Sequence, residues 1–237
     1  MDTALLERGW APTLQQAQAL ILAGRIRYHG HPETHVGTQI PDPEALELVP
    51  ASPYVSRGGE KLAGALKETN ISVAGRLCLD IGASTGGFTD CLLQAGARHV
   101  QALDVGAGLL DIRLRHDPRV TVLERVNMRH FDPNTLAEKP SFVTVDVSFI
   151  SLEKLLPKIH QVLLPDGEAL VLVKPQFEAS RKDAPKGIVK DETVRQSLID
   201  KVQASAETIG FRCKGRMNSV LEGTKGNREA FLYLGKL

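Results

Sequence analysis

A run of small residues after an aspartate is the clearest sign of chemistry in this 237-residue chain. The segment LDIGASTGGFTD at 79–90 begins as an apolar strand and ends in a helix that contains Phe88. After Asp80 and Ile81 the turn consists of small residues, which let the backbone bend sharply and approach a ligand closely: Gly82, Ala83, Ser84, Thr85, Gly86 and Gly87. Asp104 ends the next apolar run, where it can accept hydrogen bonds from ribose hydroxyls. The pattern predicts a site for a nucleoside-containing ligand.

The charge of Asp80 indicates which ligand this is. The turn lacks the G-x-G-x-x-G spacing of nicotinamide cofactor sites. A carboxylate at the strand end would repel a pyrophosphate, but it suits a cationic sulfonium or an amino-acid ammonium group. A Gly-rich turn alone often reflects only tight packing. Together with Asp80 and Asp104 it favours S-adenosyl-L-methionine, and we expect the turn residues, Phe88 and both acids to bind this cofactor.

Apolar strands and amphipathic helices alternate through most of the chain. The strands are expected at 77–81, 100–104, 120–123, 142–146 and 169–173, with helices at 88–96, 109–117 and 152–163. Such alternation predicts an α/β domain with a mostly parallel sheet covered on both faces, which binds ligands at the carboxyl ends of its strands. A long helix at 191–210 is followed by two strand-like runs, 211–220 and 229–234, expected as an antiparallel pair at one edge.

The first fifty residues have a different character. Helical spacing runs from Thr3 to about Leu22, with Thr13 as a plausible N-cap of a second helix, and short strand-like pieces follow at 25–30 and 45–49. We therefore predict a small α+β domain at 1–50, a Pro-, Ser- and Gly-containing linker at 51–57, and the large domain at 58–237. The polar loop 178–190 is either a mobile lid or a disordered connection.

Seven segments, in chain order, resemble the TlyA family, relatives of the FtsJ-like ribose methyltransferases. They are YVSRGGEKL, LDIGASTGGFTD, ALDVG, TVDVSFISL, VLVKPQFE, GIVKD and GNREAFLYL. The resemblance implies a Rossmann-like methyltransferase domain, an N-terminal RNA-binding domain of the ribosomal S-four type, and 2′-O-methylation of ribosomal RNA, at cytidines of one or both subunits. Independently of the resemblance, the scattered cysteines favour reduced thiols in a cytoplasmic protein, and we expect no metal.

The resemblance carries four catalytic positions onto Lys61, Asp146, Lys174 and Glu229. Asp146 closes the fourth expected strand and Lys174 follows the fifth, so both should point into the cofactor crevice. Methylation of a ribose hydroxyl needs an aligned oxygen and an outlet for its proton. Lys174 is the candidate for activating the hydroxyl, by removing its proton or by holding its oxygen in line. Asp146 and Glu229 would orient Lys174, and Lys61 would place the substrate.

The distribution of charge bears on RNA binding. Residues 1–50 carry three basic and six acidic side chains, whereas the remaining 187 carry 26 basic and 22 acidic ones, with clusters at 113–129 and 181–190 that suit a phosphate backbone. In the N-terminal domain Arg8, Arg25 and Arg27 are the candidate RNA contacts, joined by Arg57 after the linker. The helix that family members usually open with Ser-Arg here has Thr13-Leu14, so this domain is expected to bind weakly and to serve in positioning.

Two other functions compete with the methyltransferase. Members of the family have been labelled haemolysins, but the chain has no apolar run near the roughly 20 residues that span a bilayer. A non-catalytic RNA-binding or assembly factor is the second alternative, and the intact set of four catalytic positions argues against it. Three scattered cysteines suggest neither disulfides nor a metal site.

Overall fold

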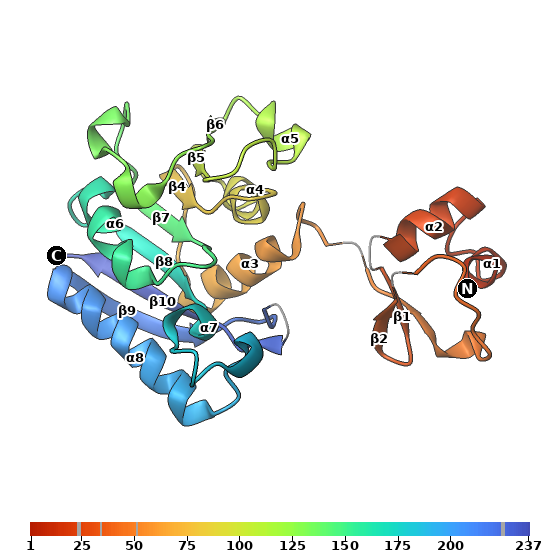
Figure 1. Cartoon of the computed structure of the whole chain (residues 1–237). Coiled ribbons are helices and arrows are strands. Elements are labelled where there is room, and N and C mark those ends of the chain that lie inside the picture. Colours follow the sequence, from red (N-terminus) through yellow and green to blue (C-terminus); the bar gives the residue numbers. More distant parts are fainter. Residues whose placement is uncertain (23–24, 34, 51, 224–225) are drawn as a thin grey trace. The chain divides into compact units, whose positions relative to one another are not determined.

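The computed structural model describes residues 1–22, 25–33, 35–50, 52–223 and 226–237. Two compact units are present, Met1–Pro53 and Tyr54–Leu237 (Figure 1). The division falls inside the segment 51–57 that the sequence predicts as a linker, of which residue 51 lies outside the described part. Residues 54–57 of that segment belong to the second unit.

The N-terminal unit contains two helices and a three-stranded antiparallel sheet. The elements are α1 (Asp2–Glu7), α2 (Leu14–Leu22), β1 (Ile26–Tyr28), β2 (His31–Glu33) and β3 (Leu46–Leu48), with strand order β2-β1-β3. Thr13 caps α2 as expected, because its Oγ1 accepts a hydrogen bond from the Gln16 amide at 3.2 Å. Leu5, Ile21 and Ile26 are fully buried in a small core. The sequence did not predict β2.

The larger unit is built on a seven-stranded sheet of order β6-β5-β4-β7-β8-β10-β9. Its first five strands in sequence are parallel, and the last two are antiparallel to their neighbours. The bounds are β4 Leu77–Ile81, β5 His99–Leu103, β6 Val120–Leu123, β7 Phe142–Val145, β8 Glu168–Val173, β9 Phe211–Asn218 and β10 Ala230–Lys236. The predicted parallel sheet with an antiparallel edge pair is confirmed.

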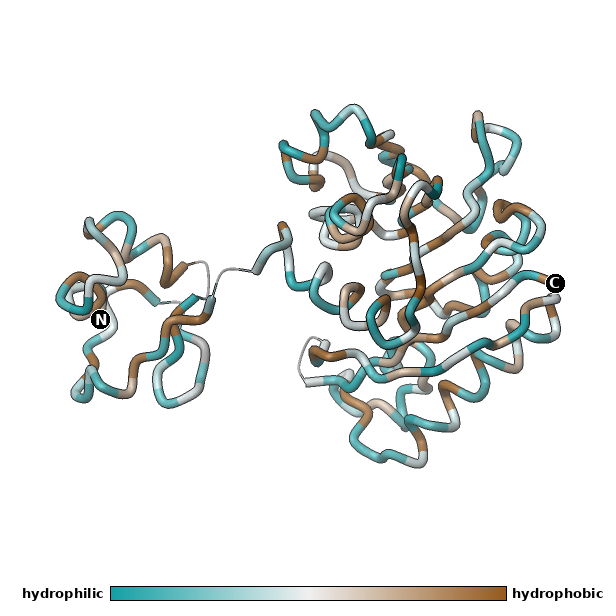
Figure 2. The backbone as a smooth tube through the Cα atoms, turned by 180° about the vertical axis from the view of Figure 1, so that it is seen from behind, coloured by the Kyte–Doolittle hydropathy of each residue, from teal (hydrophilic) through white to brown (hydrophobic). Residues whose placement is uncertain are grey.

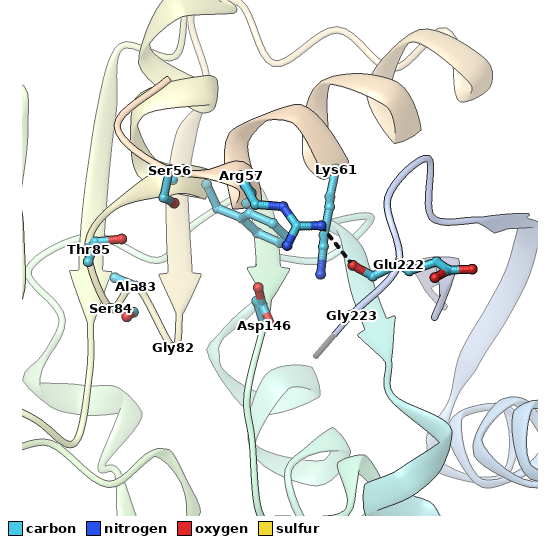
Figure 3. A pocket seen from close by; sticks show the side chains of 13 residues that line it. Ser56, Arg57, Lys61, Gly82, Ala83, Ser84, Thr85, Asp146, Glu222 and Gly223 are labelled. Atoms are coloured by element: carbon cyan, nitrogen blue, oxygen red, sulfur yellow. Dashed lines mark hydrogen bonds between the residues drawn. The ribbon is translucent and has the colours of Figure 1, made fainter. Parts of the chain in front are cut away.

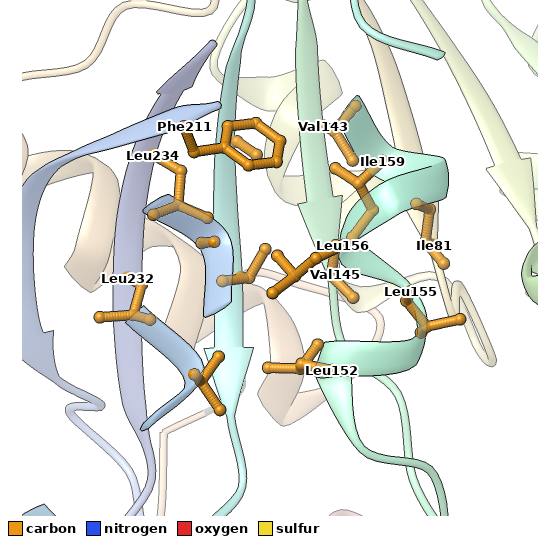
Figure 4. Close-up of a cluster of buried hydrophobic side chains, with 14 of the residues drawn as sticks. Ile81, Val143, Val145, Leu152, Leu155, Leu156, Ile159, Phe211, Leu232 and Leu234 are labelled. Atoms are coloured by element: carbon orange, nitrogen blue, oxygen red, sulfur yellow. The ribbon is translucent and has the colours of Figure 1, made fainter. Parts of the chain in front are cut away.

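Both faces of this sheet are covered because its central strands are apolar on both sides. Leu79, Val143 and Val171 pack on one face against α6 (Leu156–Val162) and α8 (Glu192–Ile209) (Figure 4). Cys78 and Phe142 pack on the other face against α3 (Arg57–Thr69) and α4 (Gly87–Gln94). Figure 2 shows hydrophobic and hydrophilic residues alternating along α8, as expected for a helix with one buried face.

Two predicted helices are shorter than the sequence suggested. The helix expected at 109–117 is only α5 (Ile112–Arg115), because Asp111 caps it by accepting a hydrogen bond from the Arg113 amide. The helix expected at 152–163 is a 3₁₀ turn, Leu152–Lys154, followed by α6. Pro157 lies in the first turn of α6, and a proline there cannot donate the hydrogen bond that would join the two pieces.

The loop between β8 and α8 is partly regular. It contains the short helix α7 (Pro175–Glu178) and a 3₁₀ turn, Pro185–Gly187. Asp191 then caps α8 through the amides of Thr193 and Val194, and Gly210 ends the helix in a left-handed conformation. The mobile lid and the disordered connection that the sequence left open for 178–190 both stay predictions.

At the edge of the sheet opposite the carboxyl ends, Glu168 joins three elements. Its carboxylate lies 2.6 Å from Arg76 Nη1 and 2.7 Å from Lys214 Nζ, and it accepts a hydrogen bond from the Tyr233 hydroxyl. Burial alone would raise the pKa of Glu168, but the hydrogen bonds from Lys214, Tyr233 and Arg76 outweigh burial and lower this pKa to about 2. The ionised form of Glu168 therefore stabilises the folded unit.

We predict that Glu168 makes stability fall with acidification. A pKa depressed in the folded state contributes stability above the unfolded value of about 4.5, and this stability is lost as pH falls toward 2. After screening, we expect Glu168 to contribute about 1–2 kcal/mol. The free energy of unfolding can be measured by urea titration between pH 6 and pH 3. E168Q should have a lower free energy of unfolding at pH 6, and this free energy should depend less on pH than in the wild type. The exposed control E207Q should keep the pH dependence of the wild type.

Candidate active site

The glycine-rich turn after β4 is shaped by contacts that exclude side chains. Gly82 has a φ of +84°, and a Cβ on it would lie 2.2 Å from the Asp146 carbonyl oxygen. A Cβ on Gly87 would lie 2.2 Å from Ser56 Oγ. The turn therefore touches the segment after β7 on one side and the start of α3 on the other. Small residues here allow three separate parts of the chain to meet at the carboxyl edge of the sheet.

Asp104 follows β5 and braces this turn. Its Oδ2 accepts a hydrogen bond from the Ser84 amide at 2.8 Å, and its Oδ1 accepts one from the Gly106 amide at 2.7 Å. Asp104 lines a cavity of about 490 Å³ whose walls are mostly apolar and include Leu109, Met128 and Val147. Carboxylate oxygens have lone pairs left for further donors, so this cavity suits an adenine and its ribose.

Asp80 lies behind the turn, outside the described cavities. Its side chain is fully buried and accepts hydrogen bonds from Thr89 Oγ1 at 2.7 Å and from Thr144 Oγ1 at 3.0 Å. Burial raises the pKa of Asp80 to about 7, although both threonine hydrogen bonds act in the opposite direction. In this geometry Asp80 ties β4 to α4 and β7, and its predicted contact with a cofactor stays a prediction.

A second cavity, of about 180 Å³, lies between the turn and the start of α3 (Figure 3). It is lined by Ala83, Thr85, Gly87 and Phe88 from the predicted cofactor segment. It is also lined by residues that the sequence did not assign to a cofactor, namely Ser56, Arg57, Gly58, Glu222 and Gly223. The SRGG segment was the available signal, since glycines at a helix start leave backbone amides accessible to an anion. Arg57 donates to the Glu222 carbonyl oxygen at 3.1 Å and borders this cavity, and its predicted contact with RNA stays a prediction.

The four predicted catalytic residues form two lysine–carboxylate pairs. Lys61 Nζ, from α3, donates to Glu229 Oε2 at 2.5 Å, and Lys174 Nζ, after β8, lies 2.6 Å from Asp146 Oδ1. Glu229 is 2% exposed at its side chain, and the two lysines are 11% and 13% exposed. Each cavity is lined by one residue from each pair. Lys61 and Asp146 line the cavity of Figure 3, whereas Lys174 and Glu229 line a third cavity. The structure thus brings all four to one place.

The third cavity, of about 430 Å³, adjoins the adenine-sized one, because Ser148 and Phe149 line both. Phe149 stands at its rim with 91% exposure and a φ of +63°, and its ring lies 5.1 Å from that of Phe177. Phe149, Gln176 and Phe177 also line a more open hollow whose cationic side chains are those of Arg129, Lys154 and Arg181. Phe88, by contrast, is 3% exposed and packs in the core near Phe231. The exposed aromatic and the cations form a surface suited to nucleic acid.

The N-terminal arginines differ in how they are used. Arg8 donates to the Leu46 carbonyl oxygen, pairs with Glu44 at 2.9 Å, and lies over the Trp10 ring. Arg25 donates to the Val49 carbonyl oxygen at 2.6 Å. Arg27 is exposed on β1. Arg8 and Arg25 therefore have roles inside the unit, which leaves Arg27 as the predicted RNA contact with the fewest competing interactions.

A nucleoside-sized cavity at the carboxyl edge of a sheet with this strand order defines the methyltransferase class. Residues 54–236 match the model of the FtsJ-like methyltransferases. The chain belongs to the FtsJ-like methyltransferase family, and the enzyme class expected from the sequence is confirmed.

Relatives match over nearly the whole chain. The Mycobacterium tuberculosis 16S/23S rRNA (cytidine-2′-O)-methyltransferase TlyA is 45% identical, with 99% of this chain and 88% of that protein covered. Hemolysin A of Brachyspira hyodysenteriae is 41% identical, with 97% and 96% covered. A solved Streptococcus thermophilus structure, provisionally described as a hemolysin, is 39% identical with a TM-score of 0.80, and 99% of this chain and 87% of that one are covered. The predicted resemblance to the TlyA family is confirmed.

Two negative findings concern the described residues alone. None of their helices is long and apolar enough to cross a membrane. They also contain no group of three or more His, Cys, Asp or Glu side chains placed to hold a metal ion.

We predict that D104A weakens cofactor binding by about 10- to 100-fold, since a hydrogen bond to a charged group contributes about 1.5–3 kcal/mol and the turn also loses its brace. Isothermal titration with S-adenosyl-L-homocysteine, whose nucleoside is that of S-adenosylmethionine, measures this. D200A on α8 removes an equal charge, away from the cavity, and should bind as the wild type does. Unchanged affinity in D104A would show that the ligand does not use this carboxylate.

Proposed function

We propose that this protein transfers a methyl group from S-adenosylmethionine to the 2′-hydroxyl of a ribose in ribosomal RNA, at cytidine. The observation that carries the proposal is the pair of lysine–carboxylate contacts, Lys61–Glu229 and Lys174–Asp146, placed where a cofactor cavity meets a cavity rimmed by an exposed phenylalanine. The 45% identity to a cytidine-2′-O-methyltransferase of 16S and 23S rRNA supports the choice of substrate. Action on ribosomal RNA would place the protein in the cytoplasm.

The residues present fit S-adenosylmethionine in two parts. Its adenosine would occupy the cavity beside Asp104, with Leu109 and Met128 against the base. Its methionine part would extend into the cavity beside Arg57, where the guanidinium and the amides at the start of the 13-residue helix α3 suit a carboxylate. When bound, the cofactor supplies an electrophilic methyl group on a sulfonium. The protein's task is then to exclude water and to align the incoming oxygen.

The Lys174–Asp146 pair would align the incoming 2′-oxygen. Lys174 Nζ is held between Asp146 Oδ1 at 2.6 Å and Ser148 Oγ at 3.1 Å, so its position is fixed before substrate arrives. From there it can hold the 2′-oxygen in line, while the carboxylates of Asp146 and Glu229 provide acceptors for the released proton. Because the methyl donor is strongly electrophilic, a fixed geometry contributes more here than a strong base does.

The surface beyond the pairs suits an unstacked nucleotide. Phe149 offers an aromatic face on which a base can stack, and such a contact contributes about 1–3 kcal/mol per base. Arg129, Lys154 and Arg181 surround the neighbouring hollow and can meet phosphates on either side of the target. The RNA-binding role of the N-terminal unit is proposed on family resemblance, with Arg27 as its most available contact.

We predict that K174A lowers the rate of methylation by about 10²–10⁴-fold and leaves cofactor affinity within about twofold, because Lys174 lines only the substrate-side cavity. Labelled S-adenosylmethionine and unmethylated ribosomal subunits provide the assay, with the product nucleoside mapped. The exposed lysine variant K67A on α3 should retain full activity. Label on a base atom, or full activity in K174A, would contradict the proposed function.

We predict that R129A and R181A each weaken binding to ribosomal subunits and reduce the slope of log affinity against log salt by about 1. Each change removes one proposed phosphate contact and should not alter cofactor affinity. Titration at several salt concentrations measures the slope. R98A removes the same charge just before β5, outside both basic clusters, where Arg98 pairs with Glu138, and it should leave the slope unchanged. Equal effects in all three variants would indicate nonspecific attraction only.

A further inference from the structure

The segment that precedes Glu229 is fixed from one side by Asn227. This asparagine is 2% exposed, and its amide crosses to the loop after α7. Its Oδ1 accepts a hydrogen bond from the Val189 amide at 3.1 Å, and its Nδ2 donates to the Gly187 carbonyl oxygen at 2.9 Å. The GIVKD segment, to which the sequence assigned no role, is therefore bound to the segment of Glu229 by the Asn227 side chain.

Arg195 fixes the same segment from the opposite side. Although charged, it is 2% exposed within α8, and its Nε donates to the Arg228 carbonyl oxygen at 2.8 Å. Its remaining donors reach Glu192 at 2.8 Å and the Asn218 side-chain oxygen. A buried guanidinium is costly unless its donors are satisfied, and here they are satisfied by groups at both ends of the segment 218–228.

The backbone between these anchors leaves little freedom for Glu229. The Asn227 carbonyl oxygen accepts from the Gly223 amide at 2.8 Å, and a Cβ on Gly223 would lie 2.0 Å from Glu229 Oε1. Gly187, Asn227 and Glu229 line the same cavity as Lys174. A change at Asn227 would thus alter a wall of the substrate-side cavity and the position of the carboxylate that holds Lys61.

We propose that Asn227 is a positioning residue for methyl transfer: it locks residues 187–189 to the segment of Glu229 and so fixes the Glu229–Lys61 pair and the substrate-side wall. This inference rests on the proposed function for its catalytic consequence. The hydrogen bonds that lock these two segments together order the backbone, and this order can be measured without an activity assay. The adenine-sized cavity contains none of these residues, so binding of the adenosine part of the cofactor is independent of Asn227, whereas the cavity beside Arg57 includes Lys61 and Gly223.

Two substitutions at Asn227 distinguish the effect of its hydrogen bonds from the effect of losing side-chain volume. N227A removes both hydrogen bonds. N227D keeps the acceptor for the Val189 amide but places an oxygen against the Gly187 carbonyl, where two acceptors repel. We expect N227A to lower kcat by about 10–100-fold and N227D to lower it less, since small misplacements at a reacting centre are costly. Affinity for adenosine, which needs only the cavity beside Asp104, should stay within about twofold in both variants. The exposed control N134A should match the wild type in every measurement.

Hydrogen exchange at the Val189 amide tests directly whether Asn227 holds residues 187–189. The E229Q variant tests how much of the effect of Asn227 on kcat depends on Glu229. Exchange should quicken by about tenfold or more in N227A and stay near wild type in N227D. In the E229Q background, N227A should lower kcat by clearly less than it does alone, because part of its effect passes through Glu229 and part through the substrate-side wall. Unchanged exchange in N227A, or a full further loss of kcat in the double variant, would overturn the inference. A wild-type protein that methylates no 2′-hydroxyl would instead refute the proposed function, while the exchange result would still decide the lock.

Discussion

The reversal of chain direction between β8 and β10 is the constraint on which the site depends. Because β10 runs antiparallel to β8, Ala230 lies opposite Val173, and the start of one strand meets the end of the other. Glu229 and Lys174 are consequently neighbours at the carboxyl edge although 54 positions separate them in the chain. A parallel β10 would have placed Glu229 at the opposite edge of the sheet, beside Glu168 and far from any cofactor.

Burial of charge at this edge imposes a second constraint. Asp80, Arg195 and Glu229 are each at most 3% exposed, and polar or ionised groups are costly to remove from water unless they are hydrogen-bonded. Each of the three has partners from other elements: threonines for Asp80, backbone and side-chain oxygens for Arg195, and a lysine for Glu229. These partners make the arrangement specific, because a shifted register would leave an acid or a guanidinium buried without them. The same network that fixes the fold thereby fixes the reacting groups.

The cofactor side and the substrate side are built by different means. On the cofactor side, Gly82 and Gly87 have no side chains, and this allows three chain segments to come within contact distance. The substrate side relies on side chains that cross between loops, as in the Asn227 bridge to Gly187 and Val189. Glycine contacts are fixed once the sheet forms, whereas bridged loops require several tertiary hydrogen bonds at once. This difference explains why the cofactor turn could be found by pattern and the substrate wall could not.

The sequence alone determined the alternating strands and helices, the antiparallel edge pair and the small-residue turn after β4, because these follow from local periodicity and small residues. It overestimated the helices at 109–117 and 152–163, where the Asp111 cap and Pro157 outweigh an apolar pattern. Only the tertiary structure decided that Arg57 borders a cavity beside that turn, that Asp80 lies behind the turn, and that the four charged residues form two lysine–carboxylate pairs. These facts depend on which distant segments meet at the carboxyl edge, and hydrophobic periodicity contains no information about that meeting.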